Sequence, residues 1–170
     1  IGTGGRCRKL MESLVKVPGV RIGAVCDIWD VNIDLAKKLA DPQAITSKNY
    51  REILDRKDID AVLIGAPDHW HVPMTVDACT AGKDVYVEKP LTHNLSEGKA
   101  VIDAQNNYKR IVQVGMQQRS MPHLQKAREI IKDGTLGDIH KIHLTWNRNQ
   151  LRHKLSKLNV DPKSLVWKDF

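Results

Sequence analysis

The chain has 170 residues, of which 41% are hydrophobic and 28% charged, and its formal net charge is +7. This length suffices for one domain and part of a second, and no apolar run approaches a membrane span. The basic residues are scattered among acids with few aromatic residues, which argues against nucleic-acid binding. Cys7, Cys26 and Cys79 form no CxxC pair and lie in apolar contexts. We therefore expect buried free thiols rather than disulfides or metal ligands.

Short β-branched runs alternate with helical segments in the first part of the chain, a pattern typical of βαβ units. Apolar residues at helical spacing indicate the first helix, which Pro18 and Gly19 end. In this part of the chain we expect helices over residues 5–17, 31–39 and 50–55, and strands over residues 20–26, 43–46 and 61–64.

The same alternation continues to about residue 120. Helices are expected over residues 72–80 and 94–108, and strands over residues 85–87 and 111–114. Asn94 with Glu97 three residues later has the spacing of an N-cap with its reciprocal acid. We place a domain boundary near residues 119–122, and beyond it we expect a helix over residues 124–131. The alternating polarity of residues 139–146 predicts a strand that buries only one face.

The chain begins with the run Ile1-Gly2-Thr3-Gly4-Gly5-Arg6. Gly2 and Gly4 provide the tight turn and close backbone approach that a pyrophosphate needs, and the following helix presents its N-terminal amides. The dinucleotide-binding fingerprint is G-x-G-x-x-G, and Cys7 occupies the position of its third glycine. Whether the helix can still pack closely on the strand is therefore an open question. Asp27 ends the second strand, where a carboxylate can bind adenosine ribose hydroxyls. A glycine-rich turn without a ligand is the alternative for the motif alone.

Residues 85–90 form a β-run that delivers Glu88, Lys89 and Pro90 at its carboxyl end. Ligands of open α/β sheets bind in the crevice beyond these strand ends. Proline fixes its own φ and restricts the preceding residue, so Lys89 is expected to be a positioned donor. The alternative is a Glu88–Lys89 ion pair in which neither residue is catalytic.

The glycine run and the Glu88-Lys89-Pro90 motif together resemble the Gfo/Idh/MocA oxidoreductase family, over residues 1 to about 146. The resemblance implies an α/β fold: a Rossmann-type doubly wound parallel sheet over residues 1–120, with strand order 3-2-1-4-5-6 and a truncated first strand. Residues 121–170 would begin a C-terminal substrate and oligomerisation domain with an open, largely antiparallel sheet. In this reading Glu88 contacts the nicotinamide ribose region, and Lys89 is catalytic because it reaches the substrate hydroxyl.

The turn after strand 61–64 supplies further candidates. Related chains carry a Pro-x-x-x-His turn beside the nicotinamide, which Pro67 and His71 match. We take His71 as a second catalytic candidate and Ala66, Pro67 and His69 as cofactor-binding candidates. The alternative for His71 is a structural residue that packs on the next helix. His69-x-His71 has no cysteine or carboxylate cluster beside it, so no metal site is expected.

In the family, the stretch that corresponds to residues 113–119 lies beside the cofactor and leads into the second domain. Gln117 and Arg119 are therefore candidates to contact the cofactor or the substrate. The alternative is a polar linker between domains. Gln117 and Arg119 complete the expected cofactor site, which also contains Gly2, Thr3, Gly4, Gly5, Arg6 and Asp27.

The expected function is NAD-dependent oxidation or reduction of a sugar, cyclitol or related polyol. Asp27 would repel a 2′-phosphate, which favours NAD over NADP, and Arg6 is the nearby guanidinium that could reverse this preference. The alternatives are an NAD-dependent glycoside hydrolase using transient oxidation and elimination, and a catalytically silent dinucleotide-binding subunit. We expect a homo-oligomer through the C-terminal sheet and no membrane partner. We also expect a fragment of a cytoplasmic protein, with export as the alternative because a leader would precede Ile1.

Overall fold

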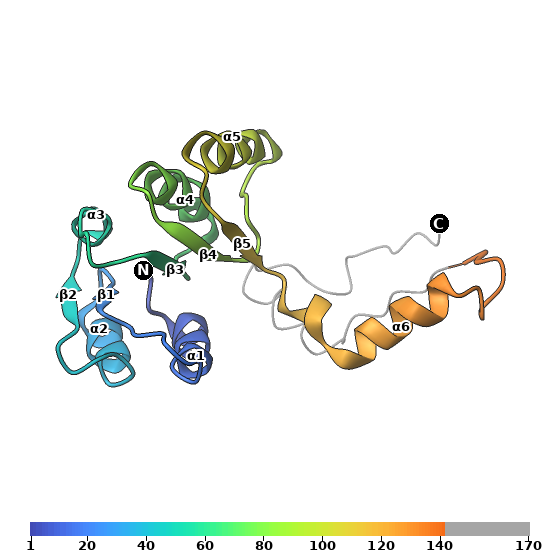
Figure 1. Ribbon diagram of the computed structural model, residues 1–170, viewed down its shortest axis with the longest axis horizontal. Coiled ribbons are helices and arrows are strands. Elements are labelled where there is room, and N and C mark those ends of the chain that lie inside the picture. The colour runs from blue at the N-terminus through green and yellow to red at the C-terminus, as the bar shows by residue number, and fades with distance from the viewer. Residues whose placement is uncertain (142–170) are drawn as a thin grey trace, which may run out of the picture. The chain divides into compact units, whose positions relative to one another are not determined.

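The computed structural model describes residues 1–141 of the protein (Figure 1). The chain divides into two compact units, Ile1–Met121 and Pro122–Phe170. The first unit holds all the candidate site residues.

Helices and strands alternate through the first unit, as the sequence predicts. The helices are α1 (Gly5–Leu14), α2 (Asp30–Lys37), α3 (Tyr50–Leu54), α4 (His71–Thr80) and α5 (Gly98–Tyr108). The strands are β1 (Ala24–Cys26), β2 (Ile45–Ser47), β3 (Ala61–Ile64), β4 (Asp84–Glu88) and β5 (Val112–Gly115). Three short 3-10 helices are η1 (Asp68–Trp70), η2 (Leu95–Glu97) and η3 (Gln117–Ser120).

All the strand pairs are parallel: β1 pairs with β2, and β4 pairs with both β3 and β5. Residues Ile1 and Gly2 lie between the two groups of strands. The Ile1 amino group donates to the Leu63 carbonyl (2.8 Å), and the Gly2 N–H donates to the Cys26 carbonyl (2.8 Å). The spatial order is therefore β2, β1, residues 1–2, β3, β4, β5. This order confirms the expected doubly wound arrangement.

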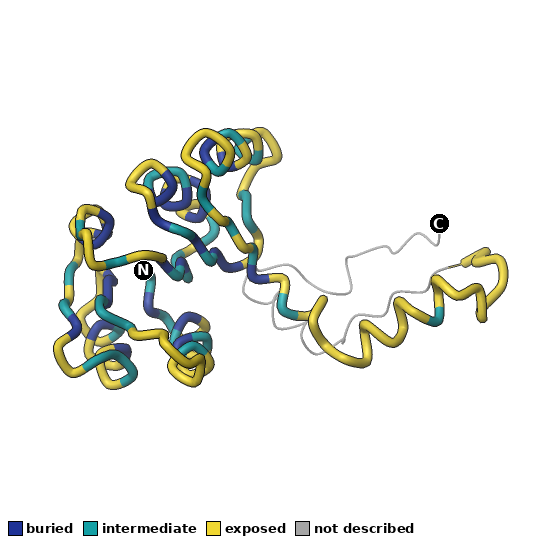
Figure 2. The backbone as a smooth tube through the Cα atoms, viewed as in Figure 1, coloured by how far each residue is buried: buried dark blue, intermediate teal, exposed yellow. Residues whose placement is uncertain are grey.

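Helices cover both faces of these strands: α1 and α2 lie on one side, and α4 and α5 on the other (Figure 1). Each side has its own apolar core, and the buried residues follow the strands and the inner faces of the helices (Figure 2). Cys7, Met11, Val25, Ile33 and Ala36 form the first core. Ile64, Val87, Ala78 and Cys79 lie at the centre of the second. Burying each large aliphatic side chain contributes about 1.5–3 kcal/mol.

Three elements differ from the sequence prediction by more than two residues at one end. The strand expected over residues 20–26 is only β1: the Gly23 carbonyl accepts from the Ile45 N–H at the start of the ladder with β2, whereas the Ile22 carbonyl accepts from the Asp41 N–H outside that ladder. The helix expected to run to residue 17 ends at Leu14. The helix expected from residue 94 begins as η2, and α5 follows it. The predicted capping box of Asn94 and Glu97 is present at its start.

The second unit contains α6 (Pro122–Lys132), an amphipathic helix with no buried residue. Gly134 follows it with φ of +78°, the left-handed conformation typical of a helix end. The strand expected over residues 139–146 falls mostly outside the described residues, as does the antiparallel sheet that it would begin. In the part of the chain that the structure describes, no helix is long and apolar enough to cross a membrane.

Candidate active site

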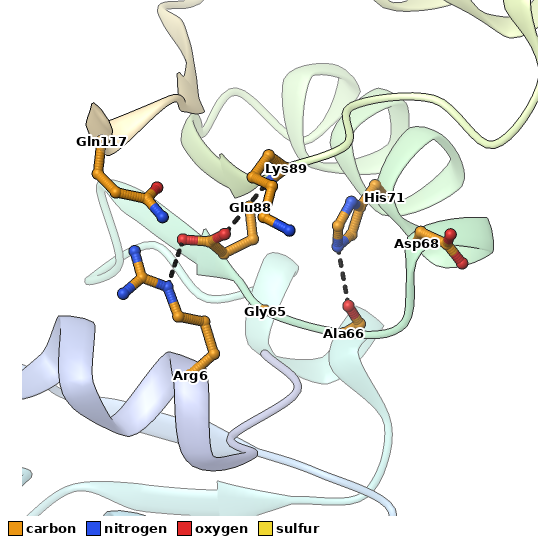
Figure 3. Close-up of a pocket in the computed structure, with 8 residues that line it drawn as sticks. All are labelled: Arg6, Gly65, Ala66, Asp68, His71, Glu88, Lys89 and Gln117. Carbon is orange, nitrogen blue, oxygen red and sulfur yellow. Dashed lines mark hydrogen bonds and ion pairs between the residues drawn. The ribbon is translucent and has the colours of Figure 1, made fainter. Parts of the chain in front are cut away.

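A cleft of about 440 Å³ lies at the carboxyl ends of β3 and β4, beside the N-terminus of α1 (Figure 3). Its lining residues are Arg6, Gly65, Ala66, Asp68, His71, Glu88, Lys89 and Gln117. The cleft thus brings together the glycine turn and the Glu-Lys-Pro motif, which are more than 80 residues apart in sequence. This position is where ligands bind to open parallel sheets.

The glycine turn leads from the centre of the sheet into α1. Gly2 has φ of +70°, and a Cβ built on it would lie 2.5 Å from the backbone of Ala66, so only glycine fits there. Gly4, the N-cap of α1, makes no side-chain cap hydrogen bond, and a Cβ on it would meet nothing within 4 Å. No side chain caps the first turn of α1, and the space beside its N-cap is open. This arrangement fits a pyrophosphate group.

Asp27 follows β1 and is 9% exposed. Its Oδ2 accepts from the Thr3 N–H (2.7 Å) and the Asn32 amide (3.2 Å), and its Oδ1 accepts from the Trp29 N–H (3.0 Å). The carboxylate thus holds the glycine turn to the end of β1. Since Oδ1 accepts only one of these bonds, it retains capacity for a hydroxyl donor.

A second guanidinium, which the sequence analysis did not single out, lies near this carboxylate. Arg8 donates through Nη1 to the Thr3 carbonyl (2.7 Å) and to Oδ1 of Asn32 (3.0 Å). Asn32 in turn donates to Asp27. Arg8 lies five residues from Thr3, and Asn32 lies five residues from Asp27. This spacing matches no motif and therefore provides no signal for either residue.

Glu88, at the end of β4, is 4% exposed and forms an ion pair with Arg6. The Arg6 Nε donates to Glu88 Oε1 (2.9 Å), and the Lys89 backbone N–H donates to Oε2 (3.2 Å). The acid is thus paired with α1 and not with the Lys89 amine. In Figure 3 that amine lies in the cleft between Glu88 and His71.

Gly115 of β5 lies opposite Glu88 in the parallel register. A Cβ there would stand 3.1 Å from Glu88 Oε1 and 2.9 Å from the Tyr86 hydroxyl. The absence of a side chain at residue 115 therefore makes room for the buried carboxylate. The sequence pattern around Gly115 gave no signal for this role, because Glu88 is distant from it in the chain.

His71, the first residue of α4, is 2% exposed. Its Nδ1 lies 2.6 Å from the Pro90 carbonyl oxygen, and its Nε2 lies 2.8 Å from the Ala66 carbonyl oxygen. Both ring nitrogens are thus in contact with the protein backbone. This geometry favours the structural alternative over proton transfer to a substrate.

Asp68 in η1 lines the cleft, whereas its neighbour His69 is largely exposed and does not. Burial raises the pKa of Asp68, but hydrogen bonds from the His69 N–H and from the His93 ring outweigh it and hold this pKa below its usual value. Asp68 is therefore a carboxylate at neutral pH. Pro67 is the N-cap of η1 and shapes the turn beside Ala66.

The two candidates after β5 differ in position. Gln117 lines the cleft, and its Oε1 is buried without a hydrogen-bond partner among the described residues. An unpaired buried acceptor is costly, so this oxygen is suited to a ligand donor. Arg119 is exposed in η3 and outside the cleft lining. Among residues 1–141, no group of three or more histidine, cysteine or acidic side chains is arranged to hold a metal ion.

A doubly wound parallel sheet with this turn at its centre defines a Rossmann-type dinucleotide-binding domain. The model of an oxidoreductase family with an NAD-binding Rossmann fold matches residues 1–116, and the chain belongs to this family, Gfo/Idh/MocA.

Three known proteins illustrate the similarity. The chain is 32% identical to the uncharacterized oxidoreductase YrbE of Bacillus subtilis over 83% of its length. It is 32% identical to an alpha-N-acetylgalactosaminidase of Shewanella oneidensis over 91% of its length. The structure of a myo-inositol 2-dehydrogenase from Lactobacillus plantarum superposes with a TM-score of 0.74 at 30% identity, covering 81% of the chain. The chain spans 41%, 37% and 41% of the lengths of these three proteins, respectively.

Proposed function

We propose that the protein is an NAD-dependent oxidoreductase acting on a hydroxyl group of a sugar, cyclitol or related polyol. The observation that carries this proposal is the shared cleft, in which the Lys89 amine and the paired Glu88 lie beside the glycine turn. The similarity to an inositol dehydrogenase supports a polyol as the substrate class.

The cofactor would lie across the glycine turn. Residues 2–5 would hold the pyrophosphate through backbone amides, and Asp27 would accept from the adenosine ribose hydroxyls. NAD is favoured over NADP because Arg6 is bonded to Glu88, at the other strand end, and so is not beside Asp27. Arg8 bonds the Thr3 carbonyl and Asn32 through Nη1. The Asp27 carboxylate would repel a 2′-phosphate.

Bound NAD would supply a hydride acceptor, and the chain must then move the hydroxyl proton. Lys89 is the group placed to do so, because Arg6 neutralises Glu88 and leaves the amine facing the cleft. Gln117 would accept a hydrogen bond from the cofactor or the substrate through its unpaired Oε1. General acid–base catalysis by one positioned group contributes roughly 10²–10⁴-fold in rate.

A second candidate is an NAD-dependent glycoside hydrolase that uses transient oxidation and elimination. The similarity to an alpha-N-acetylgalactosaminidase over 91% of the chain favours it. The same cleft residues would serve, because both reactions begin by removing hydride and proton from a sugar CH–OH group.

One pair of assays separates these candidates. The intact protein is mixed with NAD and a panel of inositols and sugars, and NADH is followed by absorbance. It is also incubated with aryl glycosides without added NAD. Stoichiometric NADH release with a free polyol supports the dehydrogenase. Aryl glycoside turnover without net NADH formation supports the hydrolase, and binding of NAD without either activity supports a silent subunit.

The second unit would begin the substrate and oligomerisation domain. We propose a homo-oligomer formed through that domain, which light scattering on the intact protein would test. A monomeric mass at micromolar concentration would contradict it.

A further inference from the structure

His71 connects the ends of two neighbouring parallel strands. Ala66 follows β3 by two residues, and Pro90 follows β4 by two residues. The carbonyl oxygens of both lie within hydrogen-bond distance of the buried His71 ring, at 2.8 and 2.6 Å. Ala66 and Lys89, the residue before Pro90, line the same cleft. The His71 side chain therefore contacts the backbone on two sides of the cleft.

The number of protons on the ring follows from its two partners. Carbonyl oxygens only accept hydrogen bonds, whereas a neutral imidazole has one N–H donor and one lone pair. In a neutral His71, the nitrogen without a proton would face a carbonyl oxygen at one of the two contacts, and these two acceptors would repel each other. An imidazolium has an N–H on each nitrogen and satisfies both.

We propose that His71 is a positioning residue that, as an imidazolium, ties Ala66 to Pro90 and thereby holds Lys89 in the cleft. The effect on catalysis rests on the proposed role of Lys89, but the protonation state of the ring does not. The ring has no free nitrogen to receive a substrate proton, so it acts through the backbone on either side of the cleft.

The charges around the cleft are compatible with a buried cation. Glu88 and Asp68 line it with negative charge, while Arg6 and Lys89 line it with positive charge. Beyond Asp68, the His69 and His93 rings lie 3.8 and 3.6 Å from its carboxylate oxygens. Burying a charge is costly unless it is hydrogen-bonded, and here both donors of the ring have acceptors.

Nitrogen-15 NMR of the intact, unmutated protein tests the protonation state directly. We expect both ring nitrogens of His71 to give protonated-type signals at pH 7, with His71→Gln used to assign them. A non-protonated-type signal from either nitrogen would overturn the proposal. This measurement needs no substrate, so it decides the matter even if no dehydrogenase or hydrolase activity is found.

Kinetics then test the positioning role. Misplacement of a catalytic group by about 1 Å can cost on the order of 10²-fold in rate. We therefore expect His71→Leu to lower kcat by roughly 10²-fold with little change in the Kd for NAD. His71→Gln, which retains an amide donor, should recover part of that loss. Exposed His123, on α6, provides the matched control: His123→Gln should leave kcat unchanged.

Two kinetic results would contradict the proposal. Normal kcat in His71→Leu would show that the ring does not position Lys89. Equal losses in kcat and NAD affinity in both His71 variants, without recovery in His71→Gln, would show a general folding role instead.

Discussion

Gly65 lies so close to Cys7 that a Cβ built on Gly65 would stand 2.7 Å from the Cβ of Cys7. Cys7 occupies the helix position where the dinucleotide fingerprint has its third glycine, and it is 1% exposed. The close approach of α1 to the sheet is thus kept by a glycine on the strand side of the contact. This resolves the packing question that Cys7 raised in the sequence.

Gly65→Ala should therefore destabilise the protein. Overpacking of a tight contact costs about 1–3 kcal/mol, and here the added methyl group would meet Cys7 and the Gly2 carbonyl, 3.1 Å away. Urea unfolding of the intact protein measures the loss. Gly23→Ala is the matched control, because its Cβ would meet only Ile59 Cδ1 at an ordinary 3.5 Å. Equal stability of the two variants would contradict this account.

Much of the fold could be predicted because it depends on local patterns. The apolar run at 61–64 and the apolar spacing in α1 predict a buried strand and an amphipathic helix. The extent of β1 could not be predicted, because the Ile22 carbonyl pairs with the Asp41 N–H and not with a neighbouring strand. That competition is tertiary and leaves no mark on the strand's own sequence.

The position of a candidate site residue was predictable where its residue type and its place at a strand end or turn together indicate a role. Lys89 and Glu88 at a strand end, and Gly2 in a turn, belong to this group. The partner of Glu88 was not predictable, because Arg6 is 82 residues away and an adjacent lysine offered an equally simple pairing. The two carbonyl contacts of His71 were also hidden, since backbone acceptors have no sequence signature.

Asp27→Ala should weaken NAD binding and narrow the difference in affinity between NAD and NADP. The variant removes the proposed acceptor for the ribose hydroxyls and leaves the Thr3 N–H without its 2.7 Å partner. Hydrogen bonds to charged groups contribute about 1.5–3 kcal/mol, so calorimetry should show a loss of roughly 10–100-fold. Asp34→Ala on α2 is the control and should bind both cofactors normally. Tighter binding of NADP than NAD by the unmutated protein would refute the role of Asp27.

The three cysteines should react slowly with iodoacetamide while the protein is folded. Burial raises the pKa values of Cys7, Cys26 and Cys79, and the thiolate is the reactive form. Because these folded-state pKa values are raised, the stability from burying neutral thiols is complete below the unfolded thiol pKa and falls as the pH rises above it. Mass spectrometry at pH 8 should show alkylation only after urea is added. Rapid native labelling of Cys7 would contradict its buried position.

Lys89→Met should impair chemistry more than cofactor binding. Methionine keeps an unbranched apolar stem but removes the charge and the amine that we propose transfers the proton, while the Arg6–Glu88 ion pair stays intact. Loss of a positioned acid–base group costs roughly 10²–10⁴-fold in kcat, and the Kd for NAD should change little. Lys99→Met, at an exposed position of α5 paired with Asp103, is the control and should turn over normally. If Lys89→Met retained near-normal turnover, Lys89 would not be the proton-transferring group, and the role would pass to another cleft group such as Asp68 or to a group outside residues 1–141.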